Sequence, residues 1–501
     1  MKRVLLAGAF VAVAMASTAQ IERSAFTSTG RGVATTFVGD YQSIGINPAN
    51  LAWTNPQNKR VSFGLVEGGA SLYSEVLARD ELRTRFIGFE DDLTVADKQR
   101  FARDFANSQL SADVDMQLIG VAVDFNDRKW GGAAVSVRDR IHFNSNLNTQ
   151  AAEILFMGWN ADYFDLLRLD DRDNGPLIAN TGTLSQDTLD RVVQGISTNP
   201  DLASQIFDGT RIKSVWYREF NFAYGREVVS TEDWVIGAGV GLKYVQGIAF
   251  LDIDVGPADY RAISATTPTF GIDYGNAAIN NPSAIPGNDN TLPSTVGSGF
   301  GIDLGANFKF KDKLRVGVAV NDIGSVNWSG NVYRAIDTLV FDLRNDGANS
   351  LNVLAEIEQF NGKDGAFKQE GVASQRLALP THFRMGASYM LRDNLHLGAD
   401  FFMSLNDAPG SFQSPIWGVG GDYAPLKWVR FSLGFLSGGN YAARIPVGIT
   451  FIAGNGTWEA GVASRDLVTY LRGDGATLSA SFGFLRFHVG NTETVPAATL
   501  Y

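Results

Sequence analysis

The chain of 501 residues contains no cysteine. This absence excludes disulfides, thiol catalysis, thiolate metal sites and the acylated cysteine of a lipoprotein. The chain also has only four histidines, and it lacks the Gly-x-Ser-x-Gly, His-Glu-x-x-His and Walker sequences that mark common classes of enzyme. We therefore expect no enzymatic activity, no cofactor and no bound metal ion.

Long apolar runs and linkers are missing as well. No apolar stretch of about 18 residues is present that would cross a membrane as a helix, and no Pro/Ser-rich linker divides the chain. The formal net charge of −11 argues against a nucleic-acid partner. Glycine, in contrast, is abundant at 54 residues, which is typical of alternating barrel strands and unusual for helix-rich enzymes.

The N-terminus has the pattern of a secretory signal peptide over residues 1–19. Lys2 and Arg3 precede an apolar stretch from Val4 to Met15, and small residues end at Ala19. The alternative is a membrane-anchoring helix, but the apolar run is shorter than the roughly 20 residues that a span needs. We expect export and cleavage before Gln20.

Residues 299–310 alternate strictly between apolar and polar or small residues. Phe300, Ile302 and Leu304 fall on one face of a strand, and Gly301 and Asp303 fall on the other. This pattern suits a half-buried soluble sheet and a transmembrane barrel strand equally well. Similar segments recur at 61–73, 112–126, 129–143, 213–226, 233–246, 313–323, 380–391, 394–404, 415–424, 427–437, 443–454, 456–468 and 475–489.

The connections between these segments distinguish the two architectures. When the segments are numbered along the chain, the connection that follows each even-numbered segment is short. The connections that follow the early odd-numbered segments are long: 74–111, 144–212, 247–297 and 324–379. A bacterial outer-membrane barrel has short periplasmic turns and long extracellular loops. The alternative, a soluble secreted β-protein, gives no physical reason for short and long connections to alternate in this way. We predict an all-β fold, a membrane-spanning antiparallel β-barrel of about 14 strands over 61–489, followed by a tail at 490–501.

Two of the long loops contain helical patterns. Thr94–Asn107 and Thr149–Arg168 carry apolar residues at mixed spacings of three and four. The second is strongly apolar, which fits either a ligand entrance or loop helices that pack on one another. We expect long, partly helical extracellular loops.

Residues 20–60 precede the first strand and lack its alternation. They contain Gly30, Gly32 and the run Asn47-Pro48-Ala49 among several apolar residues. Pro48 fixes its own φ, and Asn47 can start a turn by bonding nearby backbone. The alternatives are a flexible periplasmic tail and a compact plug, or hatch, inside the barrel; the apolar residues favour the plug.

These motifs resemble the FadL-like superfamily of outer-membrane transporters for hydrophobic compounds. The matching positions are Gly30 to Gly32 and Asn47-Pro48-Ala49, together with the barrel stretches Gly237–Tyr244, Gly299–Phe310 and Val320–Gly324. The chain looks closest to an uncharacterised branch of that superfamily, with the type IX secretion shuttle barrels as further relatives. The resemblance implies a hatch followed by a 14-stranded barrel.

The resemblance also implies a function and a location. We expect passive uptake of hydrophobic or amphipathic small molecules across the outer membrane of a Gram-negative-type bacterium. The alternative is a non-transporting outer-membrane scaffold or shuttle for protein secretion or surface attachment. The expected partners are outer-membrane lipid and a hydrophobic small-molecule ligand, or secretion-system proteins under the alternative.

Charged side chains on the inward faces of the predicted strands are candidates for the lumen. They carry both signs, which favours networks that anchor the plug over a ring selective for one kind of ion. The candidates are Lys243, Asp303, Lys309, Arg315, Arg384 and Asp400. Inward glycines have two interpretations, a ligand path or tight packing against the plug.

Asp139 and Arg218 interrupt the outward apolar faces of neighbouring strands. A charge at the bilayer midplane costs about 2–4 kcal/mol, and little near an interface. One interpretation is an ion pair between the two side chains at the interface. The other is a lateral opening of the barrel wall near Asp139, because FadL-like barrels release ligand sideways there.

Overall fold

The computed structural model describes most of the chain between residues 26 and 491. The predicted signal peptide at 1–19 and the tail beyond residue 491 lie outside the described residues. The described ranges are 26–53, 59–78, 81, 93–125, 130–170, 175–181, 184–256, 259–287, 292–350, 367–439, 441–467 and 477–491.

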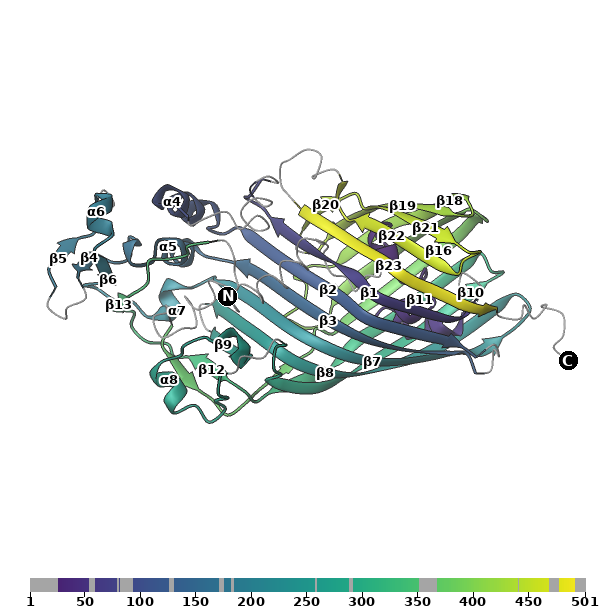
Figure 1. Ribbon diagram of the computed structural model, residues 1–501, viewed down its shortest axis with the longest axis horizontal. Coiled ribbons are helices and arrows are strands. Elements are labelled where there is room, and N and C mark those ends of the chain that lie inside the picture. The colour runs from purple at the N-terminus through teal and green to yellow at the C-terminus, as the bar shows by residue number, and fades with distance from the viewer. Residues whose placement is uncertain are drawn as a thin grey trace.

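Fourteen strands form a closed ring in which each strand pairs antiparallel with the next. The ring closes because β1 pairs with β23 from Lys59↔Asn491 to Tyr73↔Thr477. The predicted all-β barrel is therefore confirmed (Figure 1). Its strands are β1 (Lys59–Ser74), β2 (Gln109–Asp124), β3 (Gly132–Asn146), β7 (Arg211–Ser230), β8 (Trp234–Gly256), β10 (Gly297–Phe310), β11 (Leu314–Trp328), β16 (His382–Arg392), β17 (Leu395–Ser404), β18 (Ile416–Leu426), β19 (Val429–Gly438), β21 (Val447–Ala453), β22 (Trp458–Ser464) and β23 (Thr477–Asn491).

The outer wall of the ring is apolar, as the alternation in β10 predicts. Phe300 is 71% exposed, and Ile302 and Leu304 are also exposed, whereas Asp303 and Asn307 are buried toward the inside. Exposed apolar side chains continue around the ring on β7, β16, β18, β19 and β23, among them Phe222, Met385, Trp417, Leu433 and Phe484. Apolar surface of this extent in water would be costly, and lipid removes that cost.

The two ends of the barrel differ in their connections. At one end, the short-turn end, neighbouring strands join through tight turns such as 231–233, 311–313 and 393–394. At the other end, the long-loop end, the connections 147–210 and 329–381 contain further helices and strands. The predicted sorting of short and long connections is present in the structure.

The long connections build a folded layer beyond the long-loop end, which projects to the left in Figure 1. Hydrophobic residues of α5, α7, β8 and β9 form a common core there, including Ile154, Phe207 and Ile253. A separate sheet has the strand order β13-β6-β4-β5. The elements of the layer are α4 (Val95–Asp104), α5 (Thr149–Met157), β4 (Leu166–Leu169), β5 (Leu177–Ala179), α6 (Gln186–Leu189), β6 (Val192–Ile196), α7 (Ala203–Ile206), β9 (Asp259–Thr266), α8 (Asn276–Ile279), β12 (Val332–Ala335), β13 (Asp342–Leu343), β14 (Gln369–Gly371), β15 (Gln375–Ala378) and, nearer the rim, β20 (Tyr441–Arg444).

The expected boundary of one loop is wrong. The sequence pattern ends the strand at 246 and begins a loop at 247, but β8 continues to Gly256 and pairs with β9. Phe250, Leu251 and Ile253 are all buried, because the loop layer covers both faces of this extension. A strand buried on both faces loses its apolar–polar alternation and is harder to recognise in a sequence.

Helices in the described residues are short. None of them is long and apolar enough to cross a membrane.

The N-terminal segment Phe26–Trp53 lies inside the ring of strands. It contains α2 (Phe26–Thr29) and the 3₁₀ turns η1 (Tyr41–Ser43) and η2 (Pro48–Ala52), and nearly all of its residues are buried. α2 contacts β1, β21, β22 and β23, whereas η2 contacts β3, β7, β8 and β10. These strands stand on different sides of the ring, so the segment reaches across the interior.

Candidate functional site

The Asn-Pro-Ala motif forms the start of η2 and bonds directly to the barrel wall. The Asn47 side chain accepts a hydrogen bond from the Ala49 N–H and so caps the turn, while Pro48 takes the first position, where no N–H is needed. The Asn47 amide also donates to the carbonyl of Ala306 at 3.1 Å. In return, the Asn307 amide donates to the carbonyl of Ala49 at 2.7 Å.

Glycines on the inner wall make room for this turn. A Cβ added at Gly239 would lie 2.3 Å from the Ala49 nitrogen, and one at Gly225 would lie 2.4 Å from the Pro48 carbonyl oxygen. A Cβ added at Gly305 would lie 2.1 Å from the Asn47 side-chain oxygen. Close approach of another backbone is a common reason for glycine in a strand. At these positions, the packing interpretation of the inward glycines describes the structure.

Gly30 and Gly32 flank Arg31 on the other side of the lumen. Gly32 has a φ of +71°, which favours glycine, and a Cβ at Gly30 would lie 2.7 Å from the Gly448 Cα. Arg31 forms an ion pair of 2.8 Å with Asp422 of β18. All five hatch-motif residues predicted from the sequence therefore contact the wall or bring a neighbour into contact with it.

Asp400 of β17 holds the segment by one carboxylate oxygen. That oxygen accepts bonds from the Ala34 and Thr35 N–H groups at 2.7 and 2.9 Å, and from the Thr35 hydroxyl at 2.9 Å. Arg384 of β16 is fully buried nearby, with its guanidinium over the ring of Phe402. Both are inward candidates predicted from the sequence, and both lie inside the barrel.

Tyr41 and Asp40 join the segment to β1 and β23. The Tyr41 hydroxyl donates to Glu67 at 2.5 Å, and Asp40 forms an ion pair with Arg486. Burial, and then the neighbouring Glu67 carboxylate, raises the pKa of Tyr41 well above its ordinary value, so its hydroxyl remains a donor.

A network of buried charges lies nearer the long-loop end. Lys243 forms ion pairs with Asp303 at 2.7 Å and Asp322 at 2.5 Å. Arg140 of β3 joins the same network through Asp322 at 3.3 Å and Glu219 at 2.7 Å. Lys243 and Asp303, two of the predicted lumen residues, are thus brought together in a buried network in which each cation pairs with two carboxylates.

The remaining lumen candidates lie at the short-turn end. Arg315 places its guanidinium 5.0 Å from the ring centre of Trp53, the last residue of the segment. Lys309 pairs with Asp312 of the adjoining turn at 2.8 Å and is partly exposed. These two residues are not part of the network around Lys243.

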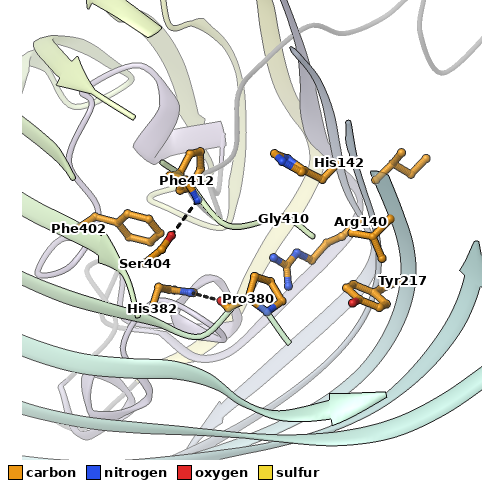
Figure 2. Close-up of a pocket in the computed structure, with 11 residues that line it drawn as sticks. Arg140, His142, Tyr217, Pro380, His382, Phe402, Ser404, Gly410 and Phe412 are labelled. Carbon is orange, nitrogen blue, oxygen red and sulfur yellow. Dashed lines mark hydrogen bonds between the residues drawn. The ribbon is translucent and has the colours of Figure 1, made fainter. Parts of the chain in front are cut away.

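A pocket lies at the long-loop end of this network (Figure 2). Its walls come from β3, β7, the start of β16, the end of β17 and the loop 405–415, and its empty volume is about 490 Å³, open solvent included. His382 donates through Nδ1 to the Pro380 carbonyl and lies 3.3 Å from the Asn321 amide, which in turn bonds the carbonyl of Ile46. The pocket is therefore linked to the N-terminal segment by direct contacts.

Sequence reasoning missed this pocket. Its residues Arg140, His142 and Tyr217 were not among the candidates, and the loop that supplies Phe412 has no strand pattern. A usable signal exists in β3: because Asp139 lies on the outward face, the alternation of a strand places Arg140 and His142 on the inward face.

Asp139 and Arg218 lie opposite each other on β3 and β7 and form two hydrogen bonds of 2.7 Å. The β3–β7 ladder has no register shift, whereas the β2–β3 ladder shifts between Gln117 and Ile119. The structure thus brings the two charges together as an ion pair. The lateral opening remains a prediction.

Comparisons with known proteins give one family and several distant structures. A family model described as a family of unknown function, DUF5723, matches residues 178–455. The search of curated proteins finds no match.

The chain is similar to three solved structures at 10–13% identity. The toluene transporter TodX of Pseudomonas putida has 13% identity and a TM-score of 0.39, with 94% of this chain and 98% of that chain covered. The toluene transporter TbuX of Ralstonia pickettii has 10% identity and a TM-score of 0.40, with 93% and 98% covered. A FadL homologue of Pseudomonas aeruginosa has 12% identity and a TM-score of 0.40, with 94% and 96% covered. Likeness at this level is too low to transfer a function.

Proposed function

The chain belongs to the DUF5723 family of unknown function, and on that premise we propose that it is a passive outer-membrane channel for small hydrophobic or amphipathic molecules. The N-terminal segment Phe26–Trp53 acts as a plug. The outward apolar wall supports residence in a membrane, and the sorting of short turns and long loops supports the outer membrane.

One observation carries the proposal. The pocket at the long-loop end is linked to the plug through His382, Asn321 and the carbonyl of Ile46. A solute that enters the pocket and displaces His382 loosens a bond that holds the plug. Hydrogen bonds and ion pairs hold the segment at several points, among them those of Asp400, Asn307 and Arg31, so movement of the plug requires these polar contacts to break.

The direct test is flux into vesicles. Full-length protein is reconstituted into liposomes, and entry of toluene and of 4-methylphenol is followed with a trapped reporter. We expect both to enter faster than into empty liposomes, and a variant lacking residues 26–53 to be faster still. Equal rates in all three preparations would contradict the proposal.

A second function is favoured by the folded layer beyond the long-loop end. The layer has a hydrophobic core of its own, and the alternative function that it favours is a non-transporting scaffold or shuttle for secreted or surface-attached proteins. Under this alternative, the barrel conducts no solute, and secretion proteins co-purify with the full chain but not with a chain whose loop 147–210 is shortened.

A further inference from the structure

The connection 405–415 between β17 and β18, which we call the strap, reaches across the long-loop end of the barrel. Its Asp407 bonds to β7, although β8, β10, β11 and β16 stand between β7 and β17 in the ring. A Cβ added at Gly410 would lie 3.8 Å from the Cγ1 atom of Val215, also on β7. Figure 2 shows Gly410 and Phe412 between side chains of β17 on one side and of β3 and β7 on the other.

Asp407 ties the strap to two cations of β7. Its carboxylate accepts hydrogen bonds from the Arg211 guanidinium at 2.5 Å and from Lys213 Nζ at 2.7 Å, and Lys213 Nζ also donates to the Asp407 carbonyl at 2.6 Å. The Lys213 side chain is 6% exposed, whereas that of Asp407 is 57% exposed. Because a partly exposed ion pair adds little net stability, this contact can break and form again.

Phe412 is the apolar anchor of the strap. It is buried in a cluster with Tyr73 of β1, Phe402 of β17, Ile416 of β18 and Leu436 of β19. The rings of Phe402 and Phe412 pack edge to face with their centres 5.3 Å apart. Moving a buried aromatic side chain into water is unfavourable, so this cluster favours the position of the strap across the barrel.

The two ends of the strap are attached to the rim. At the start, the Asn406 amide donates to the Leu379 carbonyl at 2.8 Å. At the end, the Ser414 hydroxyl donates to the Gly439 carbonyl at 2.6 Å. Movement that breaks the contacts of Asp407 and Phe412 can therefore be limited to residues 407–413, while the strands on either side stay paired.

The strap lies on one side of the pocket and the plug lies on the other. Gly410 and Phe412 line the pocket together with His382. His382 lies 3.3 Å from the Asn321 amide, which bonds the carbonyl of Ile46 in the plug. A solute in the pocket is therefore placed between the strap and the plug.

We propose that the strap is an outer gate of the channel, separate from the plug, and that the ion pairs of Asp407 with Arg211 and Lys213 keep it closed. When these pairs break, Phe412 leaves its cluster and a solute passes from the long-loop end into the pocket. The inference rests on the proposed channel function and adds a second barrier to it.

Labelling of a single cysteine tests the role of Asp407. Ala408 is 9% exposed, so Ala408→Cys in the cysteine-free chain reports movement of the strap through its rate of reaction with a maleimide. We expect Asp407→Asn to raise this rate severalfold, because the bonds to Arg211 and Lys213 lose their charge. The matched control is Asp254→Asn: Asp254 pairs with the same Arg211 at 3.0 Å but belongs to β8, so the rate should not rise.

An equal labelling rate with and without Asp407→Asn would overturn the role of Asp407, and so would an equal rise in the Asp254→Asn control. Heat-shifted migration on gels verifies that each variant is folded.

A disulfide between the strap and β7 tests the gate. The 3.8 Å between an added Cβ at Gly410 and Val215 Cγ1 places the sulfurs of Gly410→Cys and Val215→Cys within reach of each other. In liposomes, the oxidised protein should admit 4-methylphenol no faster than empty liposomes, and reduction should restore entry. The reduced protein carries the same two substitutions and is the control for any strain at Gly410. Rapid entry through the fully cross-linked protein, or failure of the cysteines to cross-link in folded protein, would overturn the inference.

The two measurements separate this inference from the proposed function. If Asp407→Asn speeds labelling but neither the parent nor any variant admits the probe, the strap contact stands and the channel falls. If the parent and the reduced protein admit the probe and oxidation does not slow its entry, the channel stands and the gate falls.

Discussion

Single side chains from distant parts of the chain hold the N-terminal segment in the barrel. Asp400 binds two backbone N–H groups and a hydroxyl, and Asp422 binds Arg31. A carboxylate that accepts several bonds in a buried site contributes more than a neutral acceptor, because charge strengthens each bond. The segment is therefore held by a few charged contacts in addition to its buried apolar residues, among them Ile44 and Leu51.

Asp400→Asn should loosen the segment without changing the size of the side chain. Loss of the charge weakens three bonds, and we expect a destabilisation of about 1.5–3 kcal/mol in this part of the molecule. Limited proteolysis of the folded protein should then cut within residues 26–53 faster than in the parent.

The matched control is Asp233→Asn in an exposed short turn, where the nearest cation, Lys311, is 3.6 Å away. An exposed pair contributes little, so this variant should resemble the parent. Identical proteolysis of the two variants would show that Asp400 does not anchor the segment.

At the scale of elements, η2 fits against glycines of β7, β8 and β10. The backbone of Pro48 and Ala49 approaches Gly239 so closely that no side chain fits between them. The Asn-Pro-Ala motif and these inward glycines therefore pack directly against each other.

Gly239→Ala should displace η2 from the wall. Because the chain has no cysteine, a single Ser43→Cys in the buried turn η1 can report the displacement through its rate of maleimide labelling. We expect labelling to rise severalfold in the Gly239→Ala background. Gly256→Ala, where an added Cβ meets nothing within 4 Å, should leave the rate unchanged; equal rates in both would contradict the packing of η2.

The outer face of β10 makes a prediction about lipid. Leu304 lies midway between Phe300 and Phe308, so Leu304→Arg should cost about 2–4 kcal/mol, and Phe310→Arg near the end of the strand about 0–1 kcal/mol. Urea unfolding from vesicles measures both. Similar costs at the two positions would place the membrane elsewhere on the barrel.

Much of the barrel could be predicted from the sequence because lipid on one side and a polar interior on the other impose alternation. β10 has that alternation over its whole length, and the sorted connections supplied the topology. The extension of β8 was missed because the loop layer buries both of its faces. The pocket was missed because it is assembled from β3, β7, β16, β17 and the loop 405–415, which only the closed ring brings together.

The whole molecule is a closed ring with an occupied interior and a folded layer at one end. Closure through β1 and β23 leaves no free strand edge, as lipid requires. The segment crosses the interior from α2 to η2, between the pocket and the short-turn end. A solute that passes through the lumen has to move this segment.

A disulfide between the segment and the wall tests that claim most directly. The Thr36 hydroxyl donates to the Ser388 hydroxyl at 2.8 Å, and both residues are buried, so Thr36→Cys with Ser388→Cys places two sulfurs within bonding reach. With no other cysteine in the chain, the bond can be made and broken cleanly. In liposomes, we predict that the oxidised protein admits 4-methylphenol no faster than empty liposomes and that reduction restores entry. Rapid entry through the oxidised, fully cross-linked protein would contradict the claim that the N-terminal segment closes the channel.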